Sequence, residues 1–118
     1  MTPTNPIWIS DQAKKLDHEE LKEKIISIFK DFSPLKILLF GSSCREQWDE
    51  TGDVDLIIVY NSPKRFLDRL KELYEQWDLP KAVDILAYTP EEFDRLMREN
   101  AFVQDAVQRG ILIYETAA

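Results

Sequence analysis

Residues 36–60, KILLFGSSCREQWDETGDVDLIIVY, decide the fold, because two short apolar runs flank a polar loop that opens with a glycine. The runs at 36–40 (KILLF) and 54–60 (VDLIIVY) have the length and aliphatic content of buried strands. Aspartates stand on both sides of Val54, at the point where the second run begins. The stretch therefore predicts two strands joined by a loop, with acidic side chains at the entry to the second strand.

Helices are expected on both sides of this stretch. From about residue 17 to residue 32, apolar side chains recur with helical spacing, and Pro34 ends the helix. Ser62 and Pro63 have the residue types of an N-cap and a first helical position, so a second helix is predicted to begin there. Its apolar stripe is Phe66, Leu70, Leu73, Tyr74 and Trp77. The charged residues Lys64, Arg65, Asp68, Arg69, Lys71, Glu72 and Glu75 are interpreted as its solvated face.

The C-terminal part continues the alternation of strands and helices. Residues 82–88 (AVDILAY) predict a third strand, and residues 89–92 (TPEE) are a capping box that opens a helix. A further helical segment at 101–109 ends at Gly110, and 111–114 predict a last strand. The order α-β-β-α-β-α-β predicts one α/β (α+β) domain, a mixed sheet with helices packed on it. Residues 1–10 are interpreted as an N-terminal tail and 11–118 as the domain.

Composition excludes several classes of protein. The 118 residues contain 15 basic and 22 acidic side chains, for a net charge of −7, so binding of long nucleic acid by the whole surface is not expected. One cysteine and one histidine exclude an internal disulfide framework and a zinc site of several such ligands. No signal peptide and no membrane-spanning run is visible, and a reducing cytoplasmic location is expected.

Three aspartates are predicted to lie inside the apolar strands, and they are the candidate metal ligands. Asp53 and Asp55 are two residues apart, so their side chains point to the same face of a strand. Asp84 joins them if the third strand lies beside the second. Carboxylates buried in strands are costly unless they are paired or bind a cation, and oxygen ligands favour Mg²⁺ when phosphates complete its shell. The alternative is that each aspartate lies at a solvated strand end; this is the better interpretation for Asp53 alone, which follows Thr51 and Gly52, but not for Asp84, which has apolar neighbours on both sides.

The glycine loop supplies candidate phosphate ligands. Gly41 permits close approach of the backbone to a phosphate, Ser42 and Ser43 add hydroxyl donors, and Arg45 adds a positive charge. A Gly-Ser pair alone usually means a turn, and the P-loop pattern is absent.

Together these features read Gly-Ser, ten residues, then Asp-x-Asp, with a third aspartate in a later strand. This pattern resembles the DNA polymerase β-like nucleotidyltransferase superfamily, and most closely the minimal nucleotidyltransferases that pair with helical HEPN-type partners as antitoxins. The resemblance implies that Gly41, Ser42, Ser43 and Arg45 bind the triphosphate. It also implies that Asp53, Asp55 and Asp84 are catalytic and hold two Mg²⁺ ions. Glu46 departs from the glycine common at that position, which puts nucleotide affinity in question.

The resemblance implies transfer of a nucleoside monophosphate, AMP from ATP, to a hydroxyl of a partner protein, which would neutralise a HEPN-type toxin. One alternative is a non-catalytic antitoxin that occludes its partner. A weaker one is transfer to a small molecule, which the lack of a second domain disfavours. The sequence leaves open the acceptor, the nucleotide preference and homo-oligomerisation.

Overall fold

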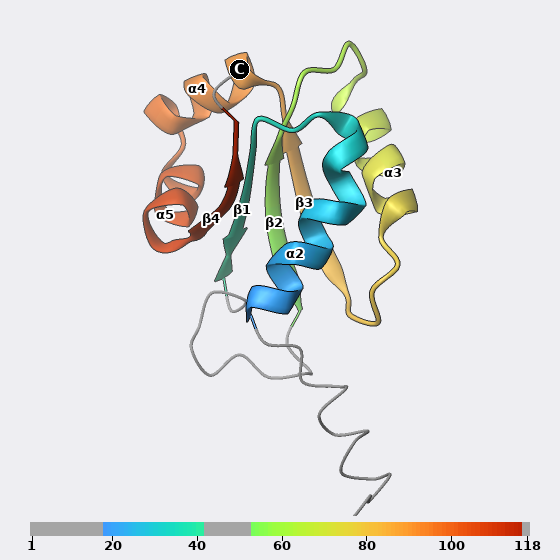
Figure 1. The fold of residues 1–118 in the computed structure, drawn as a ribbon. Coiled ribbons are helices and arrows are strands. Elements are labelled where there is room, and N and C mark those ends of the chain that lie inside the picture. The colour runs from blue at the N-terminus through green and yellow to red at the C-terminus, as the bar shows by residue number, and fades with distance from the viewer. Residues whose placement is uncertain (1–17, 42–52, 117–118) are drawn as a thin grey trace, which may run out of the picture.

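The computed structural model describes residues 18–41 and 53–116, which form a sheet with helices on both faces (Figure 1). Its helices are α2 (His18–Phe29), α3 (Phe66–Gln76), α4 (Pro90–Glu99) and α5 (Ala101–Arg109), and a 3-10 turn, η1 (Lys30–Phe32), follows α2. Its strands are β1 (Lys36–Phe40), β2 (Val54–Val59), β3 (Val83–Tyr88) and β4 (Ile111–Glu115). The predicted α/β class is thereby confirmed. The predicted tail at 1–10 lies outside the described residues.

The four-stranded sheet is mixed and has the order β3-β2-β1-β4. β1 runs antiparallel to β2, with Leu38 opposite Ile57, and antiparallel to β4. β2 and β3 are parallel, with Asp55 opposite Asp84. A parallel pair needs a long crossover, and α3 provides it between β2 and β3. In this strand order, β3 and β4 are the edge strands of the sheet.

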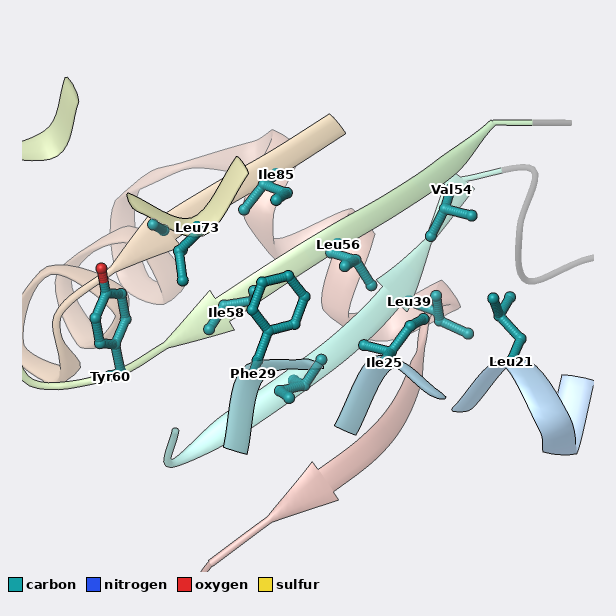
Figure 2. Close-up of a cluster of buried hydrophobic side chains, with 12 residues drawn as sticks. Leu21, Ile25, Phe29, Leu39, Val54, Leu56, Ile58, Tyr60, Leu73 and Ile85 are labelled. Carbon is teal, nitrogen blue, oxygen red and sulfur yellow. The ribbon is translucent and has the colours of Figure 1, made fainter. Parts of the chain in front are cut away.

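One face of the sheet is covered by α2 and α3. Leu21, Ile25 and Phe29 recur every four residues, so they line one side of α2, and all three are fully buried. Figure 2 shows them directed at strand residues that include Leu39 and Ile58. Burying a side chain of this size stabilises a fold by about 1.5–3 kcal/mol relative to leaving it exposed. The helical spacing of apolar residues in the first predicted helix is therefore explained by the packing of α2 against the sheet.

The opposite face is covered by α4 and α5. Its buried residues are Leu38, Ile57, Val59, Phe93, Val103 and Ala106. Because successive side chains of a strand alternate between faces, β1 and β2 contribute to both cores. This explains why their sequences are continuous apolar runs rather than alternating ones.

The start of α3 differs from the prediction. The helix begins at Phe66 with Arg65 as its N-cap, not at Ser62 and Pro63. The Ser62 hydroxyl instead accepts the Lys64 N–H at 3.1 Å, which closes a local turn before the helix. Arg65 is extended, with φ −68° and ψ 160°, so the helix cannot continue back through it.

The ends of the last two helices are fixed as their residue types predict. Thr89 caps α4, and its reciprocal hydrogen bonds with Glu92 complete the predicted capping box. Asn100, which was not predicted as a cap, caps α5 by accepting the Val103 N–H. At Gly110 a Cβ would lie 2.5 Å from the carbonyl oxygens of Ala106 and Leu39. Glycine is needed there because the end of α5 packs closely against β1.

Arg69 lies inside the protein, although the sequence places it on a solvated helix face. It is 2% exposed, and its guanidinium forms two hydrogen bonds of 2.8 and 3.1 Å with the Glu92 carboxylate. The prediction failed because Arg69 stands three residues after Phe66 and four before Leu73, inside the apolar stripe of the helix. The ion pair joins α3 to α4.

Candidate functional site

The strand directions bring the candidate residues to one end of the sheet. β1 ends where β2 begins, because the two strands are antiparallel, and Phe40 lies opposite Asp55. β3 begins beside the start of β2, because these strands are parallel. The glycine after β1 and the aspartates at the starts of β2 and β3 therefore meet at the same edge.

Asp55 and Asp84 are register partners on neighbouring strands. Both lie on the face that α4 and α5 cover further along the sheet, since their neighbours Val54 and Ile85 point into the opposite core. Asp53 stands just before β2. The prediction that Asp84 joins the two aspartates of β2 is therefore supported by the strand register.

The three carboxylates differ in their exposure. Asp55 is half-buried, whereas Asp53 and Asp84 are exposed. The expectation that all three are buried within strands is therefore wrong for Asp53 and Asp84, because β2 and β3 begin at the surface of the molecule. Only Asp55 bears a substantial cost of lost hydration.

The electrostatic environment disfavours a negative charge on Asp55. Burial raises the pKa of its carboxyl above the ordinary value, and the negative charges of Asp84 and Asp53 raise it further. A hydrogen bond between the Asp55 and Asp84 side chains acts in the same direction on this pKa. A cation bound between these carboxylates would relieve the repulsion.

Gly41 packs directly against the Asp55 carboxylate. It has φ +67°, a conformation that L-residues with a side chain seldom adopt. A Cβ at this position would lie 2.6 Å from Asp55 Oδ2, well inside van der Waals contact. Both the backbone conformation and the space therefore require glycine. The predicted phosphate loop thus starts in contact with a candidate metal ligand.

The remaining predicted phosphate ligands, Ser42, Ser43 and Arg45, lie outside the described residues, as does Glu46. Within residues 18–41 and 53–116, no three Asp, Glu, His or Cys side chains are grouped closely enough to hold a metal ion on their own. Mg²⁺ does not need such a cage, since it is commonly bound by one or two carboxylates together with phosphates and waters. The adjacent pair Asp55 and Asp84 fits this kind of site.

A second polar cluster lies at the other end of β2. The Tyr60 hydroxyl donates to Glu72 at 2.7 Å, and Lys64 pairs with the same carboxylate at 2.6 Å. A surface hollow of about 350 Å³ borders these residues and is lined by Lys64, Asp68, Lys71, Glu72 and Glu75. The hollow is separated from Asp55 by the length of β2, so it is not part of the carboxylate site.

Two aromatic residues beside the site, predicted only as parts of an apolar stripe, also form hydrogen bonds. The Tyr74 hydroxyl accepts the Ile85 N–H at 2.8 Å, next to Asp84. The Trp77 indole N–H donates to the Lys81 carbonyl oxygen at 2.7 Å, just before β3. These hydrogen bonds could have been predicted from residue type, because tyrosine and tryptophan in an apolar stripe need partners for their polar groups.

The model of the nucleotidyltransferase domain family matches residues 19–113, so this chain belongs to that family. The match covers both sheet faces and the whole carboxylate site. It confirms the resemblance inferred from the Gly-Ser and Asp-x-Asp pattern, and it identifies the chain as a nucleotidyltransferase.

Two curated relatives are named as protein adenylyltransferases. MJ0435 of Methanocaldococcus jannaschii is 34% identical over 84 residues, which cover 68% of this chain and 90% of that protein. MntA of Haemophilus influenzae is 41% identical over 64 residues, which cover 51% of this chain and 56% of that protein.

Solved structures share the fold at lower sequence identity. A mutant MntA toxin–antitoxin complex matches with a TM-score of 0.58 and 20% identity, over 81% of this chain and 74% of that chain. A toxin–antitoxin complex with AMP-PNP matches with a TM-score of 0.54 and 20% identity over the same shares. At this identity the likeness establishes the nucleotidyltransferase fold alone.

Across the described residues, no helix is both long enough and apolar enough to cross a membrane.

Proposed function

We propose that this chain transfers AMP from ATP, with Mg²⁺, to a hydroxyl group of a HEPN-type helical toxin and thereby neutralises it. The observation that carries the proposal is the juxtaposition of Asp55 and Asp84 at the sheet end where Gly41 packs against the Asp55 carboxylate. Carboxylates beside a glycine-initiated loop are suited to hold a cation and phosphates together.

Each candidate residue has a role in the proposed reaction. Gly41, with Ser42, Ser43 and Arg45, would bind the triphosphate, and Asp53, Asp55 and Asp84 would hold two Mg²⁺ ions. When bound, the ions would neutralise charge on the phosphates and lower the pKa of the attacking hydroxyl. The hydroxyl oxygen forms a bond to the α-phosphorus, the bond from that phosphorus to the bridging oxygen breaks, and pyrophosphate leaves. We assign Asp84, which is exposed, to accept the proton of the hydroxyl.

The relatives support the substrate classes. Two of them are named as protein adenylyltransferases, and fold neighbours include toxin–antitoxin complexes, one of them with AMP-PNP. The single cysteine of the chain suits a reducing cytoplasmic compartment, where we place the reaction.

The alternative is an antitoxin that acts only by occluding its partner. The environment of Asp55 disfavours this reading. Two neighbouring negative charges and burial raise the pKa of its carboxyl, so retaining all three carboxylates costs stability in the absence of a cation. A module that works by occlusion has no need of this arrangement.

Asp84→Asn tests the proposal. Asparagine is nearly isosteric and Asp84 is exposed, so the fold and partner binding should persist. Loss of a ligand and proton acceptor that acts mainly in the transition state should lower the transfer rate at least ~100-fold with little change in nucleotide affinity. The pair is co-purified, the toxin is weighed by mass spectrometry, and its activity is measured.

The matched control is Asp94→Asn, which removes one exposed carboxylate from α4. This variant should modify and silence the toxin like the parent protein. If Asp84→Asn silences the toxin fully and the toxin carries no added AMP, the occlusion mechanism replaces the enzymatic one.

A further inference from the structure

The backbone on one side of β3 faces the open edge of the sheet. The Val54 N–H bonds to the Ala82 carbonyl, and the Tyr60 N–H bonds to the Tyr88 carbonyl. Even-numbered residues of β3 therefore direct their backbone groups toward β2, and odd-numbered residues direct theirs away from it. The Ile85 N–H lies on this unpaired side, where a strand at a sheet edge normally relies on water.

Tyr74 of α3 provides a protein partner at this position. Its hydroxyl oxygen accepts the Ile85 N–H at 2.8 Å. Tyr74 is 40% exposed, so it contributes less to the apolar core than its neighbour Leu73, which is fully buried. The main structural role of Tyr74 at this edge is therefore the hydrogen bond of its hydroxyl group.

The bond is made to the peptide unit that joins Asp84 to Ile85. This planar unit carries the Asp84 carbonyl, which faces β2, and the Ile85 N–H, which faces Tyr74. The Ile85 side chain is held in the core that α2 and α3 cover, with 2% exposure. With both sides of the unit and the next side chain fixed, the direction in which Asp84 leaves the backbone is fixed as well.

A second bond, made by the residue that caps the C-terminus of α3, holds the chain just before β3. The Trp77 indole N–H donates to the Lys81 carbonyl oxygen at 2.7 Å. Trp77 is the C-cap residue of α3, and its backbone N–H bonds to the Tyr74 carbonyl oxygen. Together they hold the backbone on both sides of Asp84.

We infer that Tyr74 is a positioning residue for Asp84: its hydroxyl fixes the Asp84–Ile85 peptide unit and so aims the carboxylate at the site beside Asp55. This inference rests on the proposed nucleotidyl transfer. Tyr74 does not touch the reacting groups and acts only through the backbone of β3. The geometry of a transfer site is demanding, and a misplacement of about 1 Å can cost ~100-fold in rate.

Tyr74→Phe removes the hydroxyl and leaves the ring. We expect faster hydrogen exchange at the Ile85 amide, which is measured by NMR on the metal-free protein. In transfer to the toxin, kcat should fall at least ~10-fold while the KM for ATP stays within about twofold, because the triphosphate ligands are untouched.

The matched control is Tyr60→Phe, which also removes one tyrosine hydroxyl that makes a hydrogen bond, here to Glu72. Tyr60 stands five residues beyond Asp55, or about 16 Å along an extended strand. This variant should change neither Ile85 exchange nor kcat. Faster Ile85 exchange in Tyr74→Phe with kcat within twofold of the parent protein would show that Tyr74 only caps the strand edge, and the inference would fail.

Failure of the proposed function is recognised separately, because the unsubstituted protein would then add no AMP to the toxin. In that case Mn²⁺ affinity in the presence of ATP, measured by electron paramagnetic resonance, decides the inference. Tyr74→Phe should weaken Mn²⁺ binding at least ~3-fold, toward the value of Asp84→Asn, and Tyr60→Phe should not. Equal Mn²⁺ affinity in Tyr74→Phe and the parent protein would overturn the positioning role.

Discussion

Asp55→Asn should stabilise the metal-free protein while it abolishes metal-dependent function. Asp55 is half-buried, and its pKa is raised by burial and by the charges of Asp84 and Asp53. Asparagine resembles the protonated carboxyl in shape, and its amide can still donate a hydrogen bond to Asp84. The substitution therefore removes the unfavourable charge and retains the favourable contact.

The expected gain is about 1 kcal/mol. Neighbouring strands are about 4.8 Å apart, so we take about 5 Å between the carboxylates of the register partners Asp55 and Asp84. Two like charges at this distance repel by about 0.8 kcal/mol in a water-like dielectric and several-fold more in a protein interior. Asp84 is exposed, so the value near the water limit applies, and Asp53 and the burial of Asp55 add to it. For a chain of this size, about 1 kcal/mol raises Tm by about 4 °C.

The assay is thermal unfolding in EDTA at low salt, across a range of pH. Because the folded-state pKa of Asp55 is raised above its ordinary value of 3.8, its protonated form stabilises the fold fully below that value. This contribution is lost as the pH rises through the raised pKa. The advantage of Asp55→Asn should therefore be largest near neutral pH and vanish near pH 4, and ~1 M salt should reduce it.

Mg²⁺ with ATP should reverse the order of stability. Binding to the folded state raises the Tm of the parent protein by mass action, whereas the variant lacks a ligand for the ion. ATP with a chelator should raise neither Tm. A lower Tm for Asp55→Asn in EDTA at neutral pH would refute the reasoning, since it would mean that the Asp55 carboxylate makes hydrogen bonds that the fold requires.

Two further predictions concern Gly41 and the ion pair between Arg69 and Glu92. Gly41→Ala should lower the Tm in EDTA, because a residue with a side chain pays about 1–2 kcal/mol to adopt φ +67°. It should also remove the stabilisation by Mg²⁺ with ATP, because the new Cβ displaces the Asp55 carboxylate. A Gly41→Ala protein that is still stabilised by Mg²⁺ with ATP would contradict this contact. Glu92→Gln should lower the free energy of unfolding, measured in urea, by about 2–3 kcal/mol, which is more than the loss for Arg69→Met. The Arg69 side chain is 2% exposed and that of Glu92 is 35% exposed, so removing the carboxylate leaves a buried cation without its partner. Equal losses in the two variants would show that the burial of the cation does not set the cost.

The arrangement of helices and strands could be predicted because each element carries a local signal. The spacing of Leu21, Ile25 and Phe29 reports a single buried helix face, and the continuous apolar run of β2 reports burial on both faces. The capping box at Thr89 is a four-residue pattern with one physical meaning, and it forms as expected.

The failures share a different cause, since each depends on contacts distant in the sequence. Ser62 resembles an N-cap locally, but the path from β2 to α3 uses it in a turn instead. Arg69 resembles a surface residue until Glu92, from another helix, is placed beside it. The exposure of Asp84 likewise follows from where β3 begins at the surface, which the composition of the strand does not determine.

The register of β3 links the core to the site. Side chains alternate along a strand, so a shift of one residue would turn Ile85 out of the core that α2 and α3 cover and turn Asp84 into it. That exchange would lose the burial of an isoleucine, about 1.5–3 kcal/mol, and would bury an unpaired carboxylate at a cost of several kcal/mol more. The register that packs Ile85 and Ala87 is therefore strongly favoured, and it is the same register that sets Asp84 opposite Asp55. Apolar packing on one face of the sheet thus places the two carboxylates together on the other, and the hydrogen bond that Tyr74 accepts from Ile85 acts on a strand whose alignment is already determined.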